Sequence, residues 1–251
     1  MLPESQETPE GSKEQKLKAL FMQHDHVSPV GLIGEAFVNR GYEIETQLVV
    51  PEHRYTSPNV EFNFPDPSKF DVIVPMGSPW GAWENDTNGN WLEPELLWLR
   101  DADALGIPVF GICFGGQLLA RAHGGKVFRA QDCEIGWTHV WTEDPGLVSD
   151  GPWFSFHYDR FTVPPGAREI ARTARAPQAF VLRKNLALQF HPEVDGDTLV
   201  GWNTTPDSAF EHIERDGQDP EVLVAMTRAE ESKARERAQV LVDAFLDQVA
   251  R

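Results

Sequence analysis

Val109-Phe110-Gly111-Ile112-Cys113-Phe114-Gly115-Gly116-Gln117-Leu118-Leu119-Ala120 is the stretch that decides the fold of this 251-residue chain. Its first half is apolar and rich in β-branched residues, which predicts a buried strand, and its second half favours a helix. At the junction, Cys113 has a glycine two residues away on each side, Gly111 and Gly115. This pattern is typical of a nucleophile elbow, a sharp turn from a strand into a helix. We therefore expect Cys113 at the carboxyl end of a strand.

The residue types around Cys113 suit such a turn. The turn forces the nucleophile into a strained backbone conformation, and glycine neighbours let other chain segments pass close by. The helix that begins there directs free N–H groups and its positive dipole end towards the sulfur, which favours a thiolate. The sequence thus predicts Cys113 as a nucleophile.

A second stretch, residues 186–194, supplies a base for this nucleophile. Its alternating apolar residues predict a strand that delivers His191 at its end. His191 and Glu193 are two positions apart, so in an extended segment both side chains lie on one face. Glu193 is then able to hold one ring nitrogen of His191 while the other faces Cys113. Pro192 stiffens the link and prevents a helix.

The segment from Gly111 to Gln117, together with His191-Pro192-Glu193, resembles the Cys-His-Glu signature of the class I (triad-type) glutamine amidotransferases. Stand-alone members similar to the glutaminase domain of GMP synthase are the nearest in pattern. The resemblance also includes residues 74–79, 134–137 and 178–180, and it spans residues 17–194. It implies hydrolysis of the γ-amide of glutamine through a thioester on Cys113, with release of ammonia.

The resemblance implies further roles around Cys113. The backbone N–H groups of Ser78 and Phe114 are expected to form the oxyanion hole, and the expected substrate-binding residues are Gly77, Gln117, His157 and Tyr158. Two positions depart from the family pattern: Ser78 replaces a glycine, and Tyr158 replaces the glycine of a His-Gly-Asp segment. A tyrosine there is expected to reshape the glutamine site. For His157 we favour a supporting role, because His191 already has an orienting carboxylate.

Strands alternating with helices predict a three-layer α/β sandwich with a mostly parallel central sheet, flavodoxin-like in outline. We expect strands at residues 17–22, 42–50 and 70–74, and helices at residues 30–40, 92–105, 114–122 and 221–251. Ser28 is the expected cap of the first helix, and the apolar stripe near the end of the last is read as a packing face or a dimer seam. The tryptophan-rich residues 80–91 are expected to form a loop, either packed on itself or lining the site. Residues 17–251 then form one domain with a helical tail, preceded by a disordered lead-in over residues 1–16.

The net charge of −17 argues against a nucleic-acid partner, since phosphates would be repelled. Solubility explains the charge most simply, with a basic partner or a polyamine-like substrate as alternatives. The chain contains no run of about 18 apolar residues, so no membrane span is predicted. Two cysteines, Cys113 and Cys133, indicate a reducing cytoplasm, with Cys133 a bystander or half of a regulatory disulfide.

Metal and cofactor sites are not predicted. His24-Asp25-His26 has ligand-type residues, but no third group in the sequence completes a site, so we expect a polar loop or a contact at the rim of the substrate site. The chain has no Walker-A or G-x-G-x-x-G pattern, which argues against nucleotide binding.

Three functions remain open. The chain is a glutaminase subunit for a separate synthetase, a self-sufficient hydrolase of γ-glutamyl amides of larger amines, or a non-catalytic regulatory or binding subunit. The intact set of Cys113, His191, Glu193 and Gln117 argues against the third. A homodimer is also left open.

Overall fold

The computed structural model describes residues 16–251. The expected disordered lead-in therefore lies outside the described residues, except for Lys16. No helix of the described part is long and apolar enough to cross a membrane.

A nine-stranded sheet with the order β2-β1-β3-β4-β9-β8-β7-β5-β6 forms the centre of residues 16–251. Its parallel half contains β2 (Glu43–Leu48), β1 (Lys18–Gln23), β3 (Val72–Pro75), β4 (Val109–Ile112) and β9 (Asn185–Leu188). Its antiparallel half adds β8 (Pro177–Leu182), β7 (Arg168–Arg172), β5 (Val127–Thr142) and β6 (Gly151–Phe161). The α/β class and the three-layer arrangement are confirmed, and the sheet is parallel only in its first five strands.

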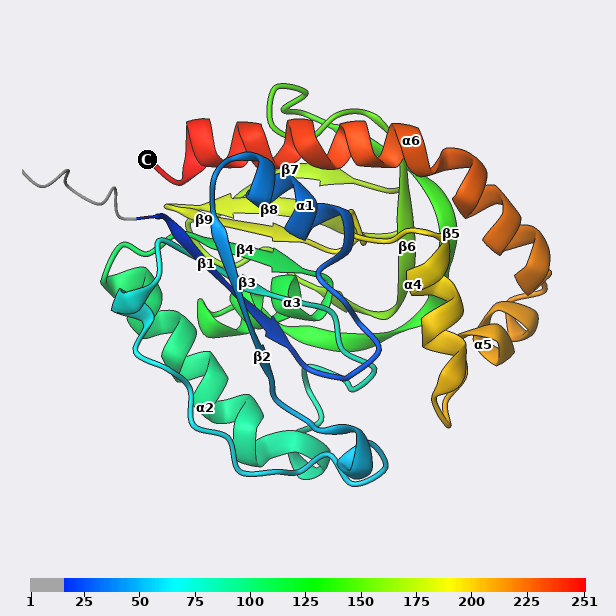
Figure 1. The fold of residues 1–251 in the computed structure, drawn as a ribbon, viewed down its shortest axis with the longest axis horizontal. Coiled ribbons are helices and arrows are strands. Elements are labelled where there is room, and N and C mark those ends of the chain that lie inside the picture. Colours follow the sequence, from blue (N-terminus) through cyan, green and yellow to red (C-terminus); the bar gives the residue numbers. More distant parts are fainter. Residues whose placement is uncertain (1–15) are drawn as a thin grey trace, which may run out of the picture.

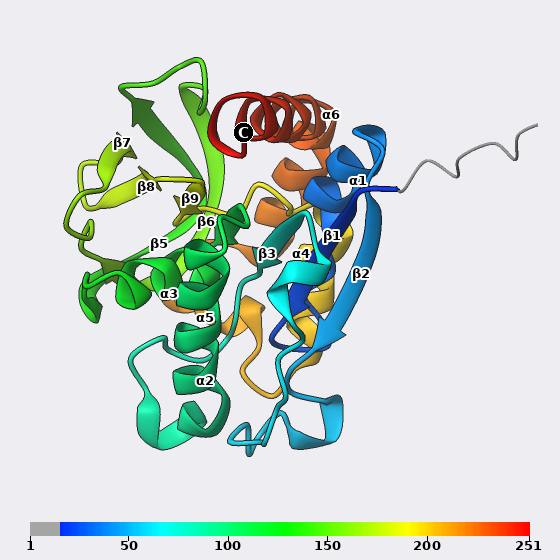
Figure 2. The ribbon, with the colours of Figure 1, turned by 90° about the vertical axis from the view of Figure 1, so that its left-hand side faces the viewer.

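Helices cover both faces of the sheet (Figures 1 and 2). One face carries α1 (Gly31–Asn39) and the long α6 (Pro220–Ala244), which ends in a π turn over Phe245–Val249, and the other carries α2 (Asn85–Ala104) and α3 (Phe114–Ala122). The short helices α4 (Gly196–Gly201) and α5 (Ala209–Arg215) pack on β5 and β6. Single 3-10 turns occupy Glu52–Arg54, Pro67–Lys69 and Trp202–Thr204.

The alternation of side chains along the buried strands creates two cores. In β1, Phe21 joins the core under α1 and α6, whereas Leu20 and Met22 join the core under α2 and α3. A strand buried on both faces needs apolar residues at every position, which is why β3 and β4 read as continuous apolar runs. The sheet therefore holds β3 and β4, and the loops that follow them, in fixed positions.

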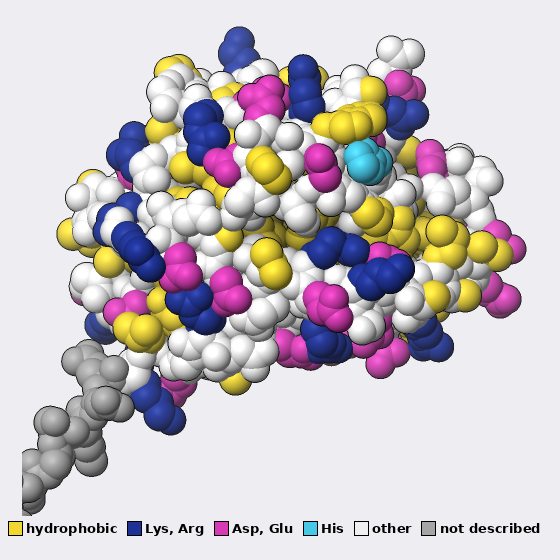
Figure 3. Space-filling view, turned by 90° about the horizontal axis from the view of Figure 1, so that it is seen from above, with side chains coloured by type: hydrophobic (Ala, Val, Ile, Leu, Met, Phe, Trp, Pro, Cys, Tyr) yellow, Lys and Arg dark blue, Asp and Glu magenta, His cyan; other side chains and the backbone are white. Residues whose placement is uncertain are grey.

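The apolar stripe of the C-terminal helix is the predicted packing face, and this outcome excludes the dimer seam for the same residues. Leu241, Val242, Phe245, Leu246 and Val249 are all buried in the core beneath α6. The stripe is a packing face within the chain, and these side chains are not available to a dimer seam. On the outer side of α6, acidic and basic side chains are interspersed (Figure 3). Arg40, for example, pairs with Asp243 at 3.1 Å and Asp247 at 2.9 Å.

Two helix starts differ from the sequence prediction. The first helix begins at Gly31 without a side-chain cap, because Val30 and not Ser28 occupies the N-cap position, and the Ser28 hydroxyl donates to Asp25 at 2.8 Å. The second begins at Asn85 rather than at residue 92, with a kink at Asn88. Burial of Trp91, which is fully enclosed in the α2 core, stabilises this segment as a helix despite its loop-like composition.

Candidate active site

The predicted elbow is present between β4 and α3. Cys113 has φ 48° and ψ −102°, a strained conformation for a non-glycine residue. Its N–H donates to the Leu188 carbonyl at 2.9 Å, which ties the turn to β9. The side chain is 6% exposed and lines a pocket of about 460 Å³. The sulfur therefore lies at the amino end of α3, at the edge of the pocket.

Close backbone contacts explain the glycines around Cys113. A Cβ atom on Gly111 would lie 2.6 Å from the Gly115 carbonyl oxygen, and one on Gly116 would lie 2.3 Å from the Leu188 oxygen. At Gly115 the added Cβ would lie 2.0 Å from the Pro75 oxygen, at the end of β3. Each neighbour is backbone that belongs to the elbow or the sheet, so it cannot move aside without distorting the turn. The glycine pattern is a packing requirement of the elbow.

Gly115→Ala is accordingly expected to destabilise the protein by about 3 kcal/mol or more, since the methyl group meets a fixed carbonyl. Gly89→Ala in α2 is the matched control, because its nearest neighbour atom would lie 3.9 Å away. The control is expected to be neutral or slightly stabilising. Urea unfolding curves of both variants test this, and equal midpoints for the two would contradict the packing argument.

The predicted base and its orienter lie together beyond the end of β9. His191 Nδ1 donates to Glu193 Oε1 at 2.7 Å, and the His191 N–H donates to the Phe154 carbonyl at 2.7 Å. Nε2 is buried and has no hydrogen-bond partner among the described residues. Burial lowers the pKa of His191, but the negative charges of the Cys113 sulfur and the Glu193 carboxylate outweigh it and raise that pKa well above its ordinary value. The geometry suits an imidazolium between a thiolate and a carboxylate.

The backbone of Glu193 is also fixed, by helix α1. The Leu32 N–H donates to the Glu193 carbonyl at 3.0 Å, and a Cβ on Gly31 would lie 2.1 Å from the same oxygen. Gly31 has φ +50°, a conformation that glycine adopts without strain. The amino end of α1 thus packs directly on the residue that orients His191.

The two expected oxyanion donors lie on neighbouring loops at the carboxyl ends of β3 and β4. The Gly115 N–H donates to the Met76 carbonyl at 3.1 Å and joins these loops. Ser78 and Phe114 both line the pocket, and within residues 16–251 neither N–H donates to another backbone group. A Cβ on Gly77 would lie 3.1 Å from His191 Cε1, so the Gly77–Ser78 segment lies against the histidine. The role of the Ser78 and Phe114 N–H groups as an oxyanion hole remains a prediction.

Gln117 faces the pocket one turn into α3, as predicted. Its Nε2 lies 3.5 Å from the Asp159 carbonyl oxygen and 3.4 Å from Gln189 Oε1. Gln189, which is fully buried, in turn places its Nε2 3.8 Å from Cys113 Sγ. Gln189 was not among the predicted site residues. Its only signal was a polar residue at the end of an apolar strand.

His157 is a buried, neutral residue. Its Nδ1 donates to the Asp159 carbonyl at 3.2 Å, and its Nε2 lies 3.5 Å from Glu134 Oε2. Burial, helped by the positive charge on His191, lowers the pKa of His157 to about 3. With so low a pKa, His157 is a weak proton acceptor at neutral pH, which supports the interpretation that it is not the base. Its predicted contact with substrate is untested, although it lines the pocket.

The lowered pKa makes His157 a source of acid sensitivity. Below its ordinary pKa of 6.5, the unfolded chain binds a proton at His157, while the folded chain does not until about pH 3. The free energy of unfolding therefore falls as the pH falls through this window. His157→Asn keeps a donor for Asp159 but cannot titrate. Between pH 7 and pH 5 the wild type is expected to lose about 2 kcal/mol more than this variant, measured by urea unfolding. Parallel stability curves would contradict the prediction.

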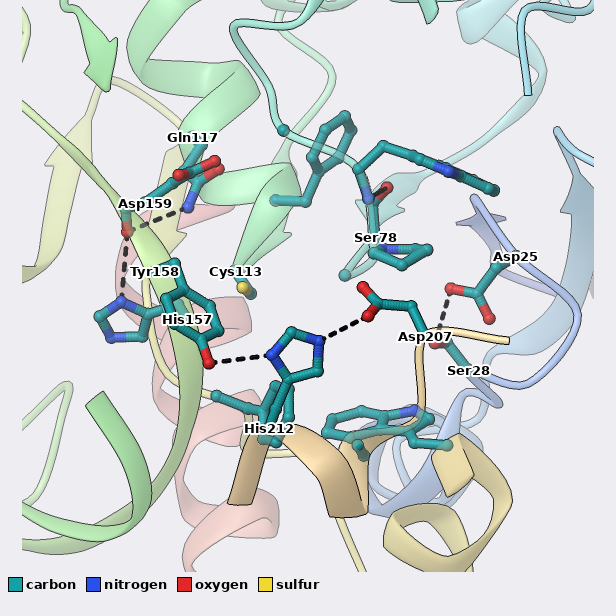
Figure 4. Close-up of a pocket in the computed structure, with 18 of the residues that line it drawn as sticks. Asp25, Ser28, Ser78, Cys113, Gln117, His157, Tyr158, Asp159, Asp207 and His212 are labelled. Atoms are coloured by element: carbon teal, nitrogen blue, oxygen red, sulfur yellow. Dashed lines mark hydrogen bonds and ion pairs between the residues drawn. The ribbon is translucent and has the colours of Figure 1, made fainter. Parts of the chain in front are cut away.

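Tyr158 points across the pocket instead of filling it. Its hydroxyl donates to His212 Nδ1 at 2.9 Å, and His212 Nε2 donates to Asp207 Oδ1 at 2.9 Å (Figure 4). Arg129 stacks on the phenol ring at 4.1 Å from its centre. In Figure 4 this chain of hydrogen bonds runs past Cys113 on the side away from Gln117. His212 and Asp207 were missed, because their segment looked only acidic and solvated.

The loop predicted over residues 80–91 is wrong from Asn85 onward, where α2 begins, but the tryptophans make both the packing and the pocket contacts considered for the segment. Trp91 is fully buried and donates to the Pro58 carbonyl at 2.9 Å. Trp80 and Trp83 instead line the pocket, and Trp83 Nε1 donates to Asp159 Oδ2 at 2.9 Å. One tryptophan therefore anchors the segment, while the other two form a wall of the pocket.

The polar residues His24 and Asp25 differ in where they lie. The polar-loop interpretation is wrong for His24, which is fully buried against Glu95, whereas Asp25 does reach the pocket.

Both cysteines are free, and burial together with the nearby Asp216 carboxylate raises the pKa of the Cys133 thiol to about 11. A thiol held in this state is a poor nucleophile. The described residues contain no cluster of three potential metal ligands.

Comparison with known proteins identifies the family. Residues 33–199 match the family described as Glutamine amidotransferase class-I, and this match covers more than half of the chain. The protein therefore belongs to the class I glutamine amidotransferases.

Similar curated sequences include two glutamine-hydrolysing GMP synthases. The one from Allorhizobium ampelinum is 38% identical over 145 residues, which cover 51% of this chain and 26% of the relative. The one from Thermomicrobium roseum is 40% identical over 136 residues, covering 49% and 23%. The matched region thus spans about a quarter of each curated relative.

Solved structures show the same fold. A glutamine amidotransferase from Thermotoga maritima superposes with a TM-score of 0.78 at 23% identity, over 94% of this chain and all of that one. A glutamine amidotransferase from Methylobacillus flagellatus gives 0.77 at 22% identity, over 94% and 96%. At this level of identity the likeness extends to the fold alone.

Proposed function

We propose that the protein hydrolyses the γ-amide of a glutamyl substrate through a thioester on Cys113. The observation that carries the proposal is the placement of the strained Cys113 in the same pocket as His191, whose ring is held by the buried Glu193. Family membership supports amide hydrolysis in general. The nucleophile, the base and the substrate are our assignment.

The reaction takes two halves. The Cys113 thiolate attacks the γ-carbonyl carbon, and the carbonyl oxygen becomes an oxyanion held by the Ser78 and Phe114 N–H groups. The carbon–nitrogen bond then breaks as His191 donates its proton to the leaving amine. In the second half His191 takes a proton from water, the hydroxide attacks the thioester, and glutamate leaves as the Cys113 thiolate is restored. Glu193 holds the imidazole ring throughout, at 2.7 Å.

Glutamine is the first candidate substrate. The curated relatives are named as glutamine-hydrolysing GMP synthases, and the matched region covers about a quarter of their length. On this proposal the chain is a glutaminase that delivers ammonia to a separate synthetase. Its activity alone is then expected to be low and to rise when that partner binds.

A γ-glutamyl amide of a larger amine is the second candidate, and the size of the pocket favours it. About 460 Å³ lies within the range of sites for drug-sized ligands, which is more than a single glutamine side chain needs. The extra space lies beside Trp80, Trp83 and the hydrogen-bonded Tyr158–His212 pair. A self-sufficient hydrolase would place the leaving amine there.

One assay separates these proposals. The isolated protein is given glutamine and, in parallel, γ-glutamyl amides of amines of increasing size, while glutamate and free amine are measured. Fast cleavage of a bulky amide with slow glutamine turnover supports the hydrolase. Slow turnover of glutamine alone supports the glutaminase subunit. No turnover of any glutamyl amide would overturn the proposed function and favour a binding subunit.

A further inference from the structure

A fully buried histidine–glutamate pair lies directly behind the pocket. His24, at the end of β1, and Glu95, in the middle of α2, are both 0% exposed. His24 Nε2 lies 3.1 Å from Glu95 Oε1 and 3.2 Å from Oε2, and Nδ1 lies 3.1 Å from the Gly77 carbonyl oxygen. The imidazole ring also packs on Phe114, with 4.6 Å between ring centres. One side chain thus contacts both loops that carry the expected oxyanion donors.

The partners of His24 define its protonation. A carbonyl oxygen only accepts hydrogen bonds, so Nδ1 must carry a proton and donate to Gly77. A carboxylate also only accepts, so Nε2 donates to Glu95. Burial opposes a charge on the ring, but the Glu95 carboxylate outweighs it and raises the pKa of His24. The Nδ1–H of His24 is therefore directed at the Gly77 carbonyl.

The hydrogen bond from His24 to the Gly77 carbonyl also sets the orientation of the Ser78 N–H. The Gly77–Ser78 peptide is trans and planar, so its C=O and N–H point in opposite directions. With the oxygen held by the buried His24, the Ser78 N–H is directed away from the protein interior, towards the pocket that both residues line. The same N–H donates to no backbone group within residues 16–251. Its orientation is set from the opposite side of the peptide.

We propose that His24, held by Glu95, is a positioning residue that aims the Ser78 N–H at the oxyanion formed during attack by Cys113. The inference rests on the proposed function and adds a part to it. The Glu95 carboxylate fixes the ring of His24, the ring fixes the Gly77 carbonyl, and the peptide plane transmits that orientation to the donor. The hydrogen bond accepted by the Gly77 oxygen also polarises the N–H of the same peptide, which strengthens its bond to an oxyanion.

The test removes the pair without leaving a buried charge. His24→Leu combined with Glu95→Leu replaces both partners by apolar side chains, an exchange that proteins often tolerate. We expect kcat and kcat/KM for the best glutamyl amide to fall together by about 100-fold, because the lost interaction acts in the transition state. In His24→Asn combined with Glu95→Leu, the amide nitrogen takes the place of Nδ1 and again donates to Gly77. Part of the lost activity is expected to return in this variant, because the donor is restored without the carboxylate that fixes it.

Alkylation of Cys113 by iodoacetamide distinguishes positioning from general damage. This displacement forms no oxyanion, so its rate is expected to be unchanged in the double-leucine variant. An equal loss of alkylation and hydrolysis would overturn the inference, as would wild-type hydrolysis by that variant. A crystal structure of it with the Gly77–Ser78 peptide in its original orientation would overturn the inference without any assay. Failure of the wild type to cleave any glutamyl amide, in contrast, counts against the proposed function alone.

Discussion

Cys113→Ala is expected to lower the turnover of every glutamyl amide by more than about 10⁴-fold, because no other group in the pocket is placed to form the thioester. Alanine is smaller than cysteine and keeps the same backbone, so the elbow is expected to fold. Glutamate and amine released by the variant and the wild type, at equal protein concentration, measure the effect. Retention of a tenth of the activity would contradict the assignment of Cys113.

Cys133→Ala is the matched control for this experiment. Cys133 is outside the pocket and its thiol lies 3.0 Å from the Asp216 carboxylate, with a raised pKa. We expect wild-type turnover in this variant. The comparison separates the loss of a particular nucleophile from any general effect of removing a thiol.

The second large effect is expected for His191→Gln, with a loss of about 10³ to 10⁴-fold. Glutamine can fill part of the space, but it can neither protonate the leaving amine nor activate water. Since both residues act in one reaction, the double variant with Cys113→Ala is expected to be no worse than Cys113→Ala alone. Alkylation of Cys113 at neutral pH should also slow, because the imidazolium that stabilises the thiolate is gone.

The combination of kcat measurement and alkylation makes the result on His191 decisive. Loss of turnover with an unchanged alkylation rate would show that His191 does not stabilise the thiolate. Unimpaired turnover would show that another residue is the base. His157 also lines the pocket, but its pKa of about 3 leaves it without a proton to donate at neutral pH.

The elbow and the His-Pro-Glu segment were predictable because their chemistry is local. Glycines at Gly111 and Gly115 report a tight turn, and a spacing of two in an extended segment places His191 and Glu193 on one face. The structure brings His191 and Cys113 into one pocket, with Glu193 bonded to His191 behind it. Local patterns also predicted α3 with its observed bounds, from Phe114 to Ala122.

What was missed depends on contacts between distant segments. His24 and Glu95 are 71 positions apart, and neither is informative alone. The one hint was a charged residue on the otherwise apolar face of α2, beside Leu92 and Leu96. Tyr158 and His212, 54 positions apart, form a similar case. Such pairs become visible only when the sheet has brought their strands and helices together.

The number of antiparallel strands in the sheet was underestimated, for a different reason. The sequence predicts a hairpin turn at Lys184-Asn185, and the structure has it one residue earlier, at residues 183–184, between the antiparallel strands β8 and β9. However, the alternation of strands and helices earlier in the chain dominated the prediction of sheet type. Long strands such as β5 have mixed burial along their length, so their pairing partners are not encoded in a simple period.

Covalent labelling with a glutamine-shaped diazoketone, 6-diazo-5-oxonorleucine, tests the central claim most directly. The reagent places a reactive carbon where the γ-amide would lie, and peptide mass spectrometry locates the bond that it forms. The account predicts one label per chain, on Cys113, with Cys133 unlabelled and with protection by the preferred glutamyl amide. A label on any other residue, or equal labelling of the Cys113→Ala variant, would contradict it.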